Sequence, residues 1–357
     1  MFVFFFDFLK GGYAVIATLF VIGGVVFLHE LGHFIIAKLC GVRVLQFSLG
    51  FPPKAYSKKI GETEYIISWI PLGGYVRMAG ENEEINEPYS FSSKSSLEKL
   101  FIIVAGPISN IFWGIVILWL IFLALGEAIP DRASTVISGV VDKSPAQTLG
   151  LQKGDSIVAI NDIFVRNWDV LDSLLSSNPG ERVRITFVRS GEVIQDTVTL
   201  LSVEIEGGKR VGKLGVYPRI RTIRRNPKDA IKKSLNLVGN MLKEIIEFLS
   251  RALSGEPVLK ELGGPILIAQ LAGKTAKSGL GSLFIFMAIL SVNLGFINLF
   301  PLPLLDGGQI IIYSIEGISR KKLPKRAKEI TQKIGVFILL LLILIITVND
   351  ICRLFGK

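Results

Sequence analysis

Long apolar stretches dominate the chain, and four of them are long enough to cross a membrane as helices. A hydrocarbon core of about 30 Å takes roughly 20 mostly apolar helical residues. The four stretches are Tyr13 to Leu39, Leu100 to Leu125, Leu280 to Leu305, and Ile334 to Val348 with its flanks. The first three contain polar residues, glycine or proline, which lipid tolerates only where they face protein or a cavity. We therefore expect chemistry in these three stretches and a plain anchor in the fourth.

The segments between these stretches have other patterns. Residues 41–98 alternate apolar and polar positions, most clearly from Glu64 to Ile70, and their glycines are typical of hairpins. Residues 127–205 contain short valine and isoleucine runs separated by turn residues, which predicts a compact β-rich module with one helix. From Pro227 the apolar positions recur with a helical period. This amphipathic helix either lies on the outer membrane surface or packs on the soluble module.

The sequence therefore predicts a polytopic α-helical membrane protein with about four transmembrane helices, a membrane-associated β-hairpin region and one inserted α+β module. The predicted segments are 1–40 (first transmembrane helix), 41–98 (hairpin or re-entrant region on the cytoplasmic side), 99–126 (second transmembrane helix), 127–205 (inserted module), 206–279 (linker and amphipathic helix), 280–306 (third transmembrane segment, ending at Asp306), 307–333 (basic cytoplasmic loop) and 334–357 (fourth transmembrane helix and tail).

Composition supports a bilayer rather than nucleic acid as the partner. Half of the residues are hydrophobic, and the mean hydropathy of +0.52 is well above that of a soluble enzyme. The net charge is +10, but the basic residues flank apolar runs and no nucleic-acid-binding motif is present. The two cysteines, Cys40 and Cys352, are far apart and predict neither a disulfide framework nor a thiolate metal cluster.

The basic residues also predict an orientation. The loop from 307 to 333 is rich in lysine and arginine, which places it in the cytoplasm. Residues 41–98 then share that side, whereas both termini and residues 127–279 lie outside. The basic cluster from Arg219 to Lys233 runs against this assignment, but long domains translocate largely regardless of charge.

The first apolar stretch contains a motif for zinc chemistry. Residues 29–33 read His29-Glu30-Leu31-Gly32-His33, so a helix places both imidazoles on one face, and Glu30 can reach a zinc-bound water. These are the only histidines in the chain. Two randomly placed histidines give this pattern in about 3 of 10,000 cases. We therefore expect a metal site, because histidines and a carboxylate inside an apolar helix otherwise cost several kcal/mol.

A catalytic zinc ion usually takes three protein ligands, and the third is expected to be a carboxylate. Asp306 abuts a long apolar segment that is broken by two prolines. The alternative is an ordinary helix end with an aspartate in the turn before Gly307-Gly308. With Tyr13 at the outer boundary, His29 lies about 24 Å deep, near the cytoplasmic edge where Asp306 is expected. The sequence predicts one zinc ion per chain.

At this point the residues resemble a known family, the site-2 protease family of intramembrane zinc metalloproteases, and specifically the bacterial regulator-of-sigma-E protease type. The resemblance covers most of the chain. It is carried by the His29 to His33 motif, Phe47 to Phe51, Pro71 to Val76, Ala105 to Asn110, Gly264 to Ile266, and Asn298 to Gly308. It also identifies the inserted module as PDZ-like.

The resemblance implies that His29, His33 and Asp306 bind zinc and that Glu30 is the general base. It implies that Asn298 and Asn110 hold an unwound substrate segment; the alternative for each asparagine is a hydrogen bond between helices. Gly50 and Phe51 resemble the family's re-entrant hairpin, which presents substrate as an extended strand. Two positions depart from the family pattern: Pro52 replaces a glycine, and Gln309 stands where histidine is common.

The function implied is cleavage of single-pass membrane proteins, such as anti-sigma factors or remnant signal peptides, in regulated intramembrane proteolysis. The expected location is the bacterial inner membrane, with the PDZ-like module on the periplasmic side, where it binds a peptide or limits access. Two other classes remain open from the residues alone. A zinc transporter would place its polar groups along a pore, whereas these converge on one level. A membrane adaptor built on the PDZ-like module would not need the metal ligands.

Overall fold

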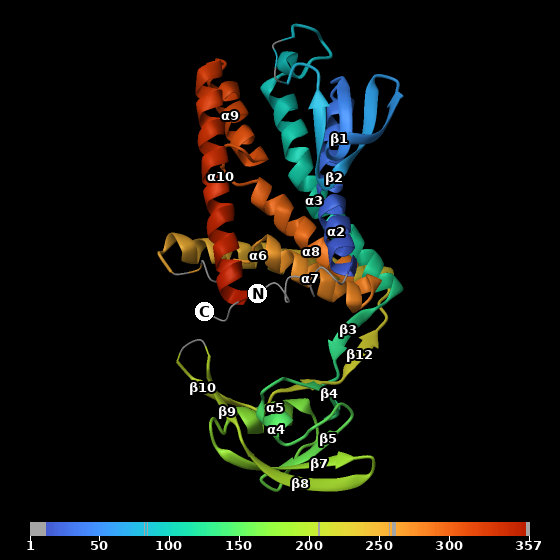
Figure 1. The fold of residues 1–357 in the computed structure, drawn as a ribbon, viewed down its shortest axis with the longest axis vertical. Coiled ribbons are helices and arrows are strands. Elements are labelled where there is room, and N and C mark those ends of the chain that lie inside the picture. The colour runs from blue at the N-terminus through green and yellow to red at the C-terminus, as the bar shows by residue number, and fades with distance from the viewer. Residues whose placement is uncertain are drawn as a thin grey trace. The chain divides into compact units, whose positions relative to one another are not determined.

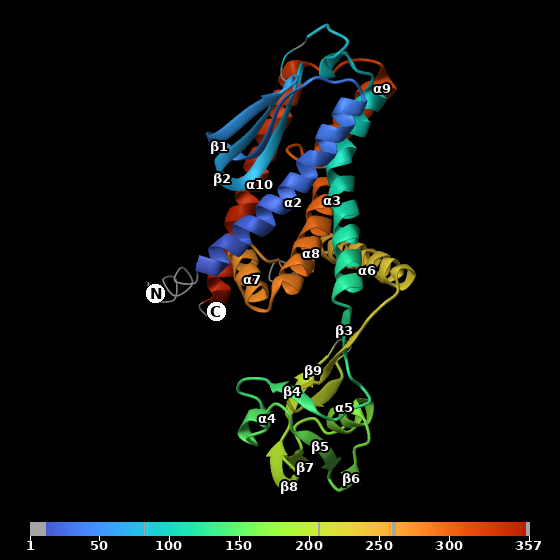
Figure 2. The same ribbon diagram turned by 90° about the vertical axis from the view of Figure 1, so that its right-hand side faces the viewer.

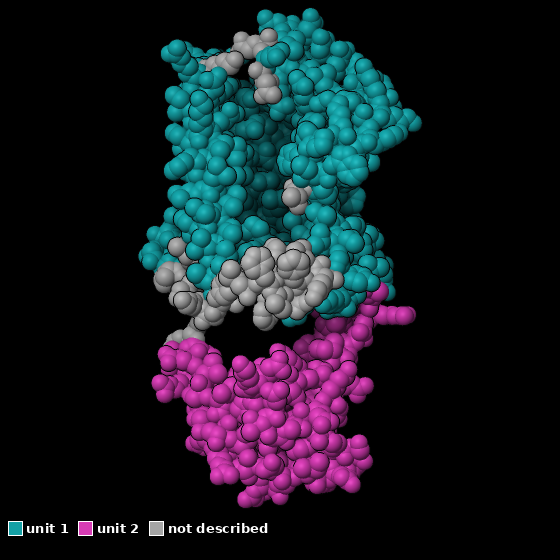
Figure 3. Space-filling view, in the orientation of Figure 1, with its two compact units in different colours: residues 1–124, 226–357 teal, residues 125–225 magenta. Residues whose placement is uncertain are grey.

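The computed structural model describes residues 12–81, 83, 85–205, 208–256, 258 and 262–354. The chain divides into two compact units, coloured separately in Figure 3. The helical unit comprises residues 1–124 and 226–357, and the inserted unit comprises residues 125–225. Each unit has its own hydrophobic core, and each is described here by itself.

The helical unit contains seven α-helices within its described residues (Figure 1). They are α2 (Gly12–Leu39), α3 (Ser96–Ala124), α6 (Pro227–Leu253), α7 (Pro265–Lys277), α8 (Leu280–Asn298), α9 (Asp306–Ser319) and α10 (Lys325–Leu354). Four helices in the described part of the chain are long and apolar enough to cross a membrane: Gly12–Leu39, Ser96–Ala124, Leu280–Asn298 and Arg326–Arg353. They coincide with the four stretches that hydropathy predicts.

Two predicted segments differ from the structure. The third apolar segment was expected to run to Asp306, but its helix ends at Asn298, and Asp306 is the first residue of α9. The basic loop predicted from 307 to 333 is mostly helical, because it contains most of α9 and the start of α10. Figures 1 and 2 show α9 lying beyond the end of α8, and α10 running back along the unit.

Prolines and glycines explain the tight loop between α8 and α9. Pro301 and Pro303 have no amide hydrogen to continue a helix. Gly307 and Gly308 then lie directly against the backbone of the preceding turn. A Cβ added to Gly307 would lie 2.1 Å from the Phe300 carbonyl oxygen, a distance that real side chains do not adopt. The tight turn therefore requires glycine, and it carries Asp306 back toward the helices.

Helices α2, α3 and α8 pack side by side and form the centre of the helical unit (Figures 1 and 2). Small residues let their backbones approach closely, as is common between membrane helices. A Cβ on Gly32 would meet the Ala105 carbonyl oxygen at 2.3 Å, and one on Gly295 would meet the Pro107 carbonyl oxygen at 2.7 Å. Ser109 Oγ also donates to the Leu28 carbonyl at 2.6 Å. These contacts fix α2 and α8 relative to α3.

Helix α10 is packed much less tightly than the other candidate spans. Its apolar window is 11% buried, against 33–39% for the other three. It is anchored near both ends: Lys328 pairs with Glu316 of α9 at 2.7 Å, and the Asp350 carboxylate accepts from the amides of Gly264 and Ile266 at the start of α7. Figure 3 shows a deep hollow in the helical unit beside this helix.

The hairpin region consists of two long, bent strands, β1 (Val44–Ile60) and β2 (Thr63–Met78), followed by a short 3-10 helix, η1 (Phe91–Ser93). The first part of β1, residues 44–49, pairs on both sides: with residues 74–78 and with residues 64–67. Residues 54–60 then pair with residues 63–68. Residues 74–78 are thus an edge of the sheet, because no other strand within the described residues pairs with them.

The inserted unit has an α+β fold. Its elements are β3 (Glu127–Pro130), β4 (Ile137–Val140), α4 (Pro145–Thr148), β5 (Ser156–Ile160), β6 (Ile163–Phe164), α5 (Trp168–Ser176), β7 (Arg182–Arg189), β8 (Glu192–Thr199), β9 (Leu201–Glu204), β10 (Arg210–Lys213), β11 (Val216–Pro218) and β12 (Ile220–Ile223). Strands β6, β5, β7 and β8 form one sheet, in that order. Phe187, Ile157 and Leu171 lie in the core between the sheet and α5.

The inserted unit continues beyond the predicted boundary at residue 205. Residues 210–223 were assigned to a linker, but they form three short strands that pair with β9, β4 and β3. The unit ends at Arg225. The amphipathic helix predicted from Pro227 is α6, whose first turn is capped by Asn226, which accepts from the amide of Asp229. It packs on α3 within the helical unit through Ala230 and Val238.

Candidate metal centre and active site

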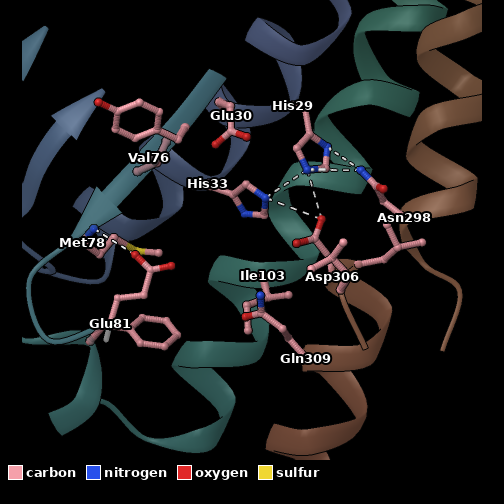
Figure 4. A pocket seen from close by; sticks show the side chains of 14 residues that line it. His29, Glu30, His33, Val76, Met78, Glu81, Ile103, Asn298, Asp306 and Gln309 are labelled. Carbon is pink, nitrogen blue, oxygen red and sulfur yellow. Dashed lines mark hydrogen bonds and ion pairs between the residues drawn. The ribbon is translucent and has the colours of Figure 1, made fainter. Parts of the chain in front are cut away.

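A polar cavity of about 290 Å³ opens where the central helices meet the edge of the β1–β2 sheet. It is lined by residues of α2, β2, α3, α8 and α9 and of the connecting segments: His29, Glu30, His33, Tyr75, Val76, Met78, Glu81, Phe91, Ile103, Asn298, Leu304, Leu305, Asp306 and Gln309. Figure 4 shows its polar side chains pointing inward from these elements. The cavity therefore brings together distant parts of the sequence.

Three possible metal ligands converge in this cavity (Figure 4). Asp306 Oδ2 lies 3.0 Å from His29 Nε2 and 3.6 Å from His33 Nε2. The two Nε2 atoms are 3.2 Å apart. Tetrahedral zinc with bonds of about 2.0–2.1 Å needs ligand atoms roughly 3.3 Å apart. The three separations therefore fit one zinc ion.

Hydrogen bonding outside the cavity supports the same assignment. His33 Nδ1 lies 2.8 Å from the Ile102 carbonyl oxygen, which can only accept, so Nδ1 carries the proton and Nε2 of the neutral ring keeps its lone pair. Asp306 Oδ2 is buried and has no well-aligned hydrogen-bond donor. The lone pair of His33 Nε2 thus faces the Asp306 carboxylate across a short distance, which is unfavourable unless a cation lies between them. The donor set fits zinc.

Asn110 lies behind His29 rather than in the cavity. It is fully buried, and its amide nitrogen is 3.2 Å from His29 Nδ1. When His29 Nε2 binds a metal, Nδ1 carries a proton and needs an acceptor. Rotating the Asn110 amide presents Oδ1 to that proton, and the nitrogen then faces Ser291 Oγ, which now lies 3.2 Å from Oδ1. Asn110 thus lies between helices beside His29 and does not line the cavity, so its predicted contact with substrate stays a prediction.

Asn298 does line the cavity and is 9% exposed. Its amide nitrogen is 3.4 Å from Nδ1 and 3.3 Å from Nε2 of His29. A nitrogen that is equally far from both ring nitrogens lies over the ring face, so it is not engaged in a strong in-plane hydrogen bond. The amide is therefore available to a backbone group that enters the cavity.

Glu30 lies in the cavity beside the three ligand residues, one position after His29 on α2. Its carboxylate interacts with the backbone amide of Val76 in β2. This contact holds the acid between the metal ligands and the sheet edge. A carboxylate there is within reach of groups that bind at either place, as a general base must be.

Gly50 and Phe51, by contrast, do not line the cavity. Gly50 has a φ of +93°, and a Cβ there would lie 2.8 Å from the Ile70 carbonyl oxygen. Phe51 is exposed, with its ring close to Gly73. Both residues shape the bend of the hairpin, and the sheet residues that meet the cavity are Tyr75, Val76 and Met78.

Gly106 of α3 is a further site residue, which was not predicted from the sequence. A Cβ at Gly106 would lie 2.2 Å from His33 Nε2 and 2.8 Å from His29 Cε1. Only glycine leaves room for both imidazoles. The sequence offered one signal, the small residues Ala105 and Gly106 beside a proline within an apolar helix, but the need for glycine depends on a helix distant in sequence.

Comparison with known proteins places the chain among proteases. The model of peptidase family M50 matches residues 17–342. A protein of Clostridium perfringens, named as a zinc metalloprotease, is 33% identical over 94% of this chain and 98% of its own length. The regulator of sigma-W protease RasP of Bacillus subtilis is 29% identical over 96% of this chain and 99% of its own. The zinc metalloprotease RasP of Geobacillus kaustophilus is also 29% identical, over 96% and 98%.

Among solved structures, the chain is similar to the PDZ domain of an SdrC-like protein from Listeria monocytogenes. The two are 20% identical over 24% of this chain and 85% of that domain, with a TM-score of 0.21.

Proposed function

Because this chain belongs to peptidase family M50, the site-2 protease family of zinc metalloproteases, we propose that it hydrolyses peptide bonds within or near the transmembrane segments of single-pass membrane proteins. The observation that carries the proposal is the convergence of His29, His33 and Asp306 beside Glu30, in a cavity built on candidate membrane-spanning helices. Anti-sigma factors and remnant signal peptides are substrates of this kind, and their cleavage is a step of regulated intramembrane proteolysis.

Each residue of the cavity has a role in this proposal. His29, His33 and Asp306 hold zinc, which when bound makes a water molecule more acidic and a carbonyl carbon more electrophilic. Glu30 takes the proton from the attacking water and returns it to the departing amine. Asn298 donates to a backbone carbonyl of the substrate. Asn110 orients His29 through Nδ1.

The edge of the β1–β2 sheet is where we expect the substrate to bind. A peptide bond in a helix is shielded by its own hydrogen bonds, so the segment must unwind before it is cut. An extended segment can then pair with residues 74–78, whose other side already pairs with residues 44–49. The amide of Met78 points away from β1, since it donates to the Glu81 carboxylate, and the amide of Val76, two residues earlier on the strand, points the same way. This edge runs beside the metal ligands.

The proposed orientation follows from charge. The basic residues between α8 and α10 place that connection in the cytoplasm, so the cavity lies near the cytoplasmic face and the inserted unit on the opposite side. In a bacterium this corresponds to the inner membrane with a periplasmic PDZ-like unit, which would bind a peptide or limit access of bulky proteins.

The test is cleavage of a tagged model single-pass substrate by the purified protein in detergent. We expect Glu30→Gln to keep zinc but to cut at least about 1,000-fold more slowly, because a general base is lost while the ligands stay. His33→Ala should lose both zinc and cleavage. Glu83→Gln, a change of the same kind at an exposed residue outside the cavity, is the matched control. Equal cleavage by wild type and Glu30→Gln would refute the mechanism.

A further inference from the structure

Glu81 is a cavity carboxylate without a role in the mechanism above. It follows the edge strand directly, lines the same cavity as the metal ligands, and is exposed. Its Oε2 accepts from the backbone amide of Met78 at 3.1 Å. Figure 4 shows Glu81 reaching into the cavity on the β2 side, below Met78. The carboxylate thus occupies an amide that an added substrate strand would need.

Glu81 has no ion-pair partner in the part of the chain that the structure describes, although Arg77 acts on it from a greater distance. No lysine or arginine there lies within ion-pair distance of its carboxylate, whereas Glu64 and Glu316 each pair with a lysine. Within the cavity, the two positive charges of zinc are balanced by the carboxylates of Asp306 and Glu30. Glu81 then adds a further carboxylate to the cavity, and its ionised form favours a cationic partner.

The register of the edge strand indicates where that partner would lie. Val76 meets Glu30 and Met78 meets Glu81, so the two carboxylates mark amides two residues apart. This separation is about 6.5–7 Å along a strand. A substrate strand paired with residues 74–78 would place its reacting bond near Glu30. The substrate residue that faces Glu81 would then be about two positions away.

We propose that Glu81 selects substrates that carry a lysine or arginine about two residues from the bond that is cut. The substrate displaces the Glu81 carboxylate from the Met78 amide, pairs with that amide, and offers its own cation to the carboxylate in exchange. Single-pass proteins supply such residues, because their cytoplasmic flanks are enriched in lysine and arginine. The inference rests on the proposed function and adds a substrate class to it.

The test uses the full-length protein and a series of model single-pass substrates. Lysine, glutamine or glutamate is placed singly at each position within three residues of the cleaved bond, on either side, and kcat/KM is measured for each. Wild type should prefer lysine to glutamate about tenfold at one position, two residues from the bond. Glu81→Gln, which keeps an acceptor for the Met78 amide, should remove this preference. Glu81→Lys should reverse it.

The controls separate this inference from the proposed function. Glu83→Lys makes the same charge change two residues further on, outside the cavity, and should keep the wild-type preference. Zinc content, measured on each variant, reports an intact site. Cleavage with no charge preference at any position, or a preference that both Glu81 variants retain, would overturn the role of Glu81. Failure of wild type to cut any substrate in the series would overturn the proposed function, and the inference with it.

Discussion

Two aspartates with enclosed carboxylate oxygens, one in each unit, show two uses of the same side chain. Asp155 of the inserted unit is 2% exposed and saturated with partners: its carboxylate accepts from Arg189 Nε at 2.9 Å, from Arg189 Nη2 at 2.6 Å and from the Gln152 amide at 2.7 Å. Asp306 of the helical unit also has an enclosed Oδ2, but this oxygen has no hydrogen-bond partner, and the nearest groups are the Nε2 atoms of His29 and His33.

The difference shows how a carboxylate that stabilises the fold can be told from one that serves a binding site. A buried charge that is fully paired costs little and holds a fold together, whereas one that faces further acceptors is stable only when a cation joins the set. In the inserted unit, Asp155 stabilises the loop around it through its hydrogen bonds to Gln152 and Arg189. The helical unit keeps its acid in an arrangement that only a ligand completes, as binding sites do.

The strongest test of this difference is to remove the carboxylates of Asp306 and Asp155 in turn. Asp306→Ala should reduce zinc from about one ion per chain to near zero and abolish cleavage, because a catalytic zinc needs its three protein ligands. Asp155→Asn should leave the zinc content and the cleavage rate close to wild type. The two are measured by metal analysis and by cleavage of the model substrate in the same preparation. A zinc-loaded Asp306→Ala protein would contradict the assignment of this ligand.

A smaller effect is expected from adding one methyl group next to the ligands. Gly106→Ala places a carbon 2.2 Å from His33 Nε2, so the imidazole must shift. Displacing a catalytic group by about 1 Å can cost roughly 100-fold in rate. We expect a loss of that order in kcat, with reduced zinc affinity.

Gly239→Ala in α6 is the matched control for Gly106→Ala, since nothing lies within 4 Å of the added carbon. It should keep full activity and be slightly more stable, by about 0.5–1 kcal/mol, because alanine is the better helix former. Wild-type activity in Gly106→Ala would show that the ring positions are not fixed as described.

The smallest expected effect is the response of the inserted unit to acid. Arg189 holds the pKa of Asp155 below its usual value near 3.8. The folded state therefore binds this proton less readily than the unfolded state, so the stabilisation is complete above that usual value and is lost as the pH falls through it toward the lower folded pKa. Hydrogen exchange of residues 125–225 in the full-length protein, between pH 6 and pH 3, measures this. Asp155→Asn should flatten the acid-dependent part of the profile, and an unchanged profile would contradict the assignment.

The sequence marks polar residues that interrupt apolar segments, but it does not mark residues that are needed only for their small size at a close contact. His29, Glu30 and His33 interrupt an apolar helix and Asp306 ends an apolar segment, so the cost of burial marks each of them. Nothing in the chain marks Gly106 in the same way, because a glycine matters only through the atoms that face it.

The predicted ends of the inserted module and of the third apolar segment were wrong for a related reason. Strands β10, β11 and β12 have three or four residues each, too few to show a period of two, so they resembled a linker. The prolines at 301 and 303 predicted a break in the third apolar segment, but not the tight loop after it or the new helix that begins at Asp306. Such turns depend on contacts between residues that become neighbours only after folding.

The turn between α8 and α9 also allows a metal ion at this site to cross-link distant parts of the chain. His29 and His33 lie near the beginning of the sequence and Asp306 near its end, so an ion held by all three closes a loop that includes most of the chain. Closing a long loop removes conformational freedom from the unfolded chain, as a cross-link does. Zinc bound at these residues would act as a reversible cross-link that joins α9 to the central helices. Through the Glu316–Lys328 pair it would also hold α10 in place.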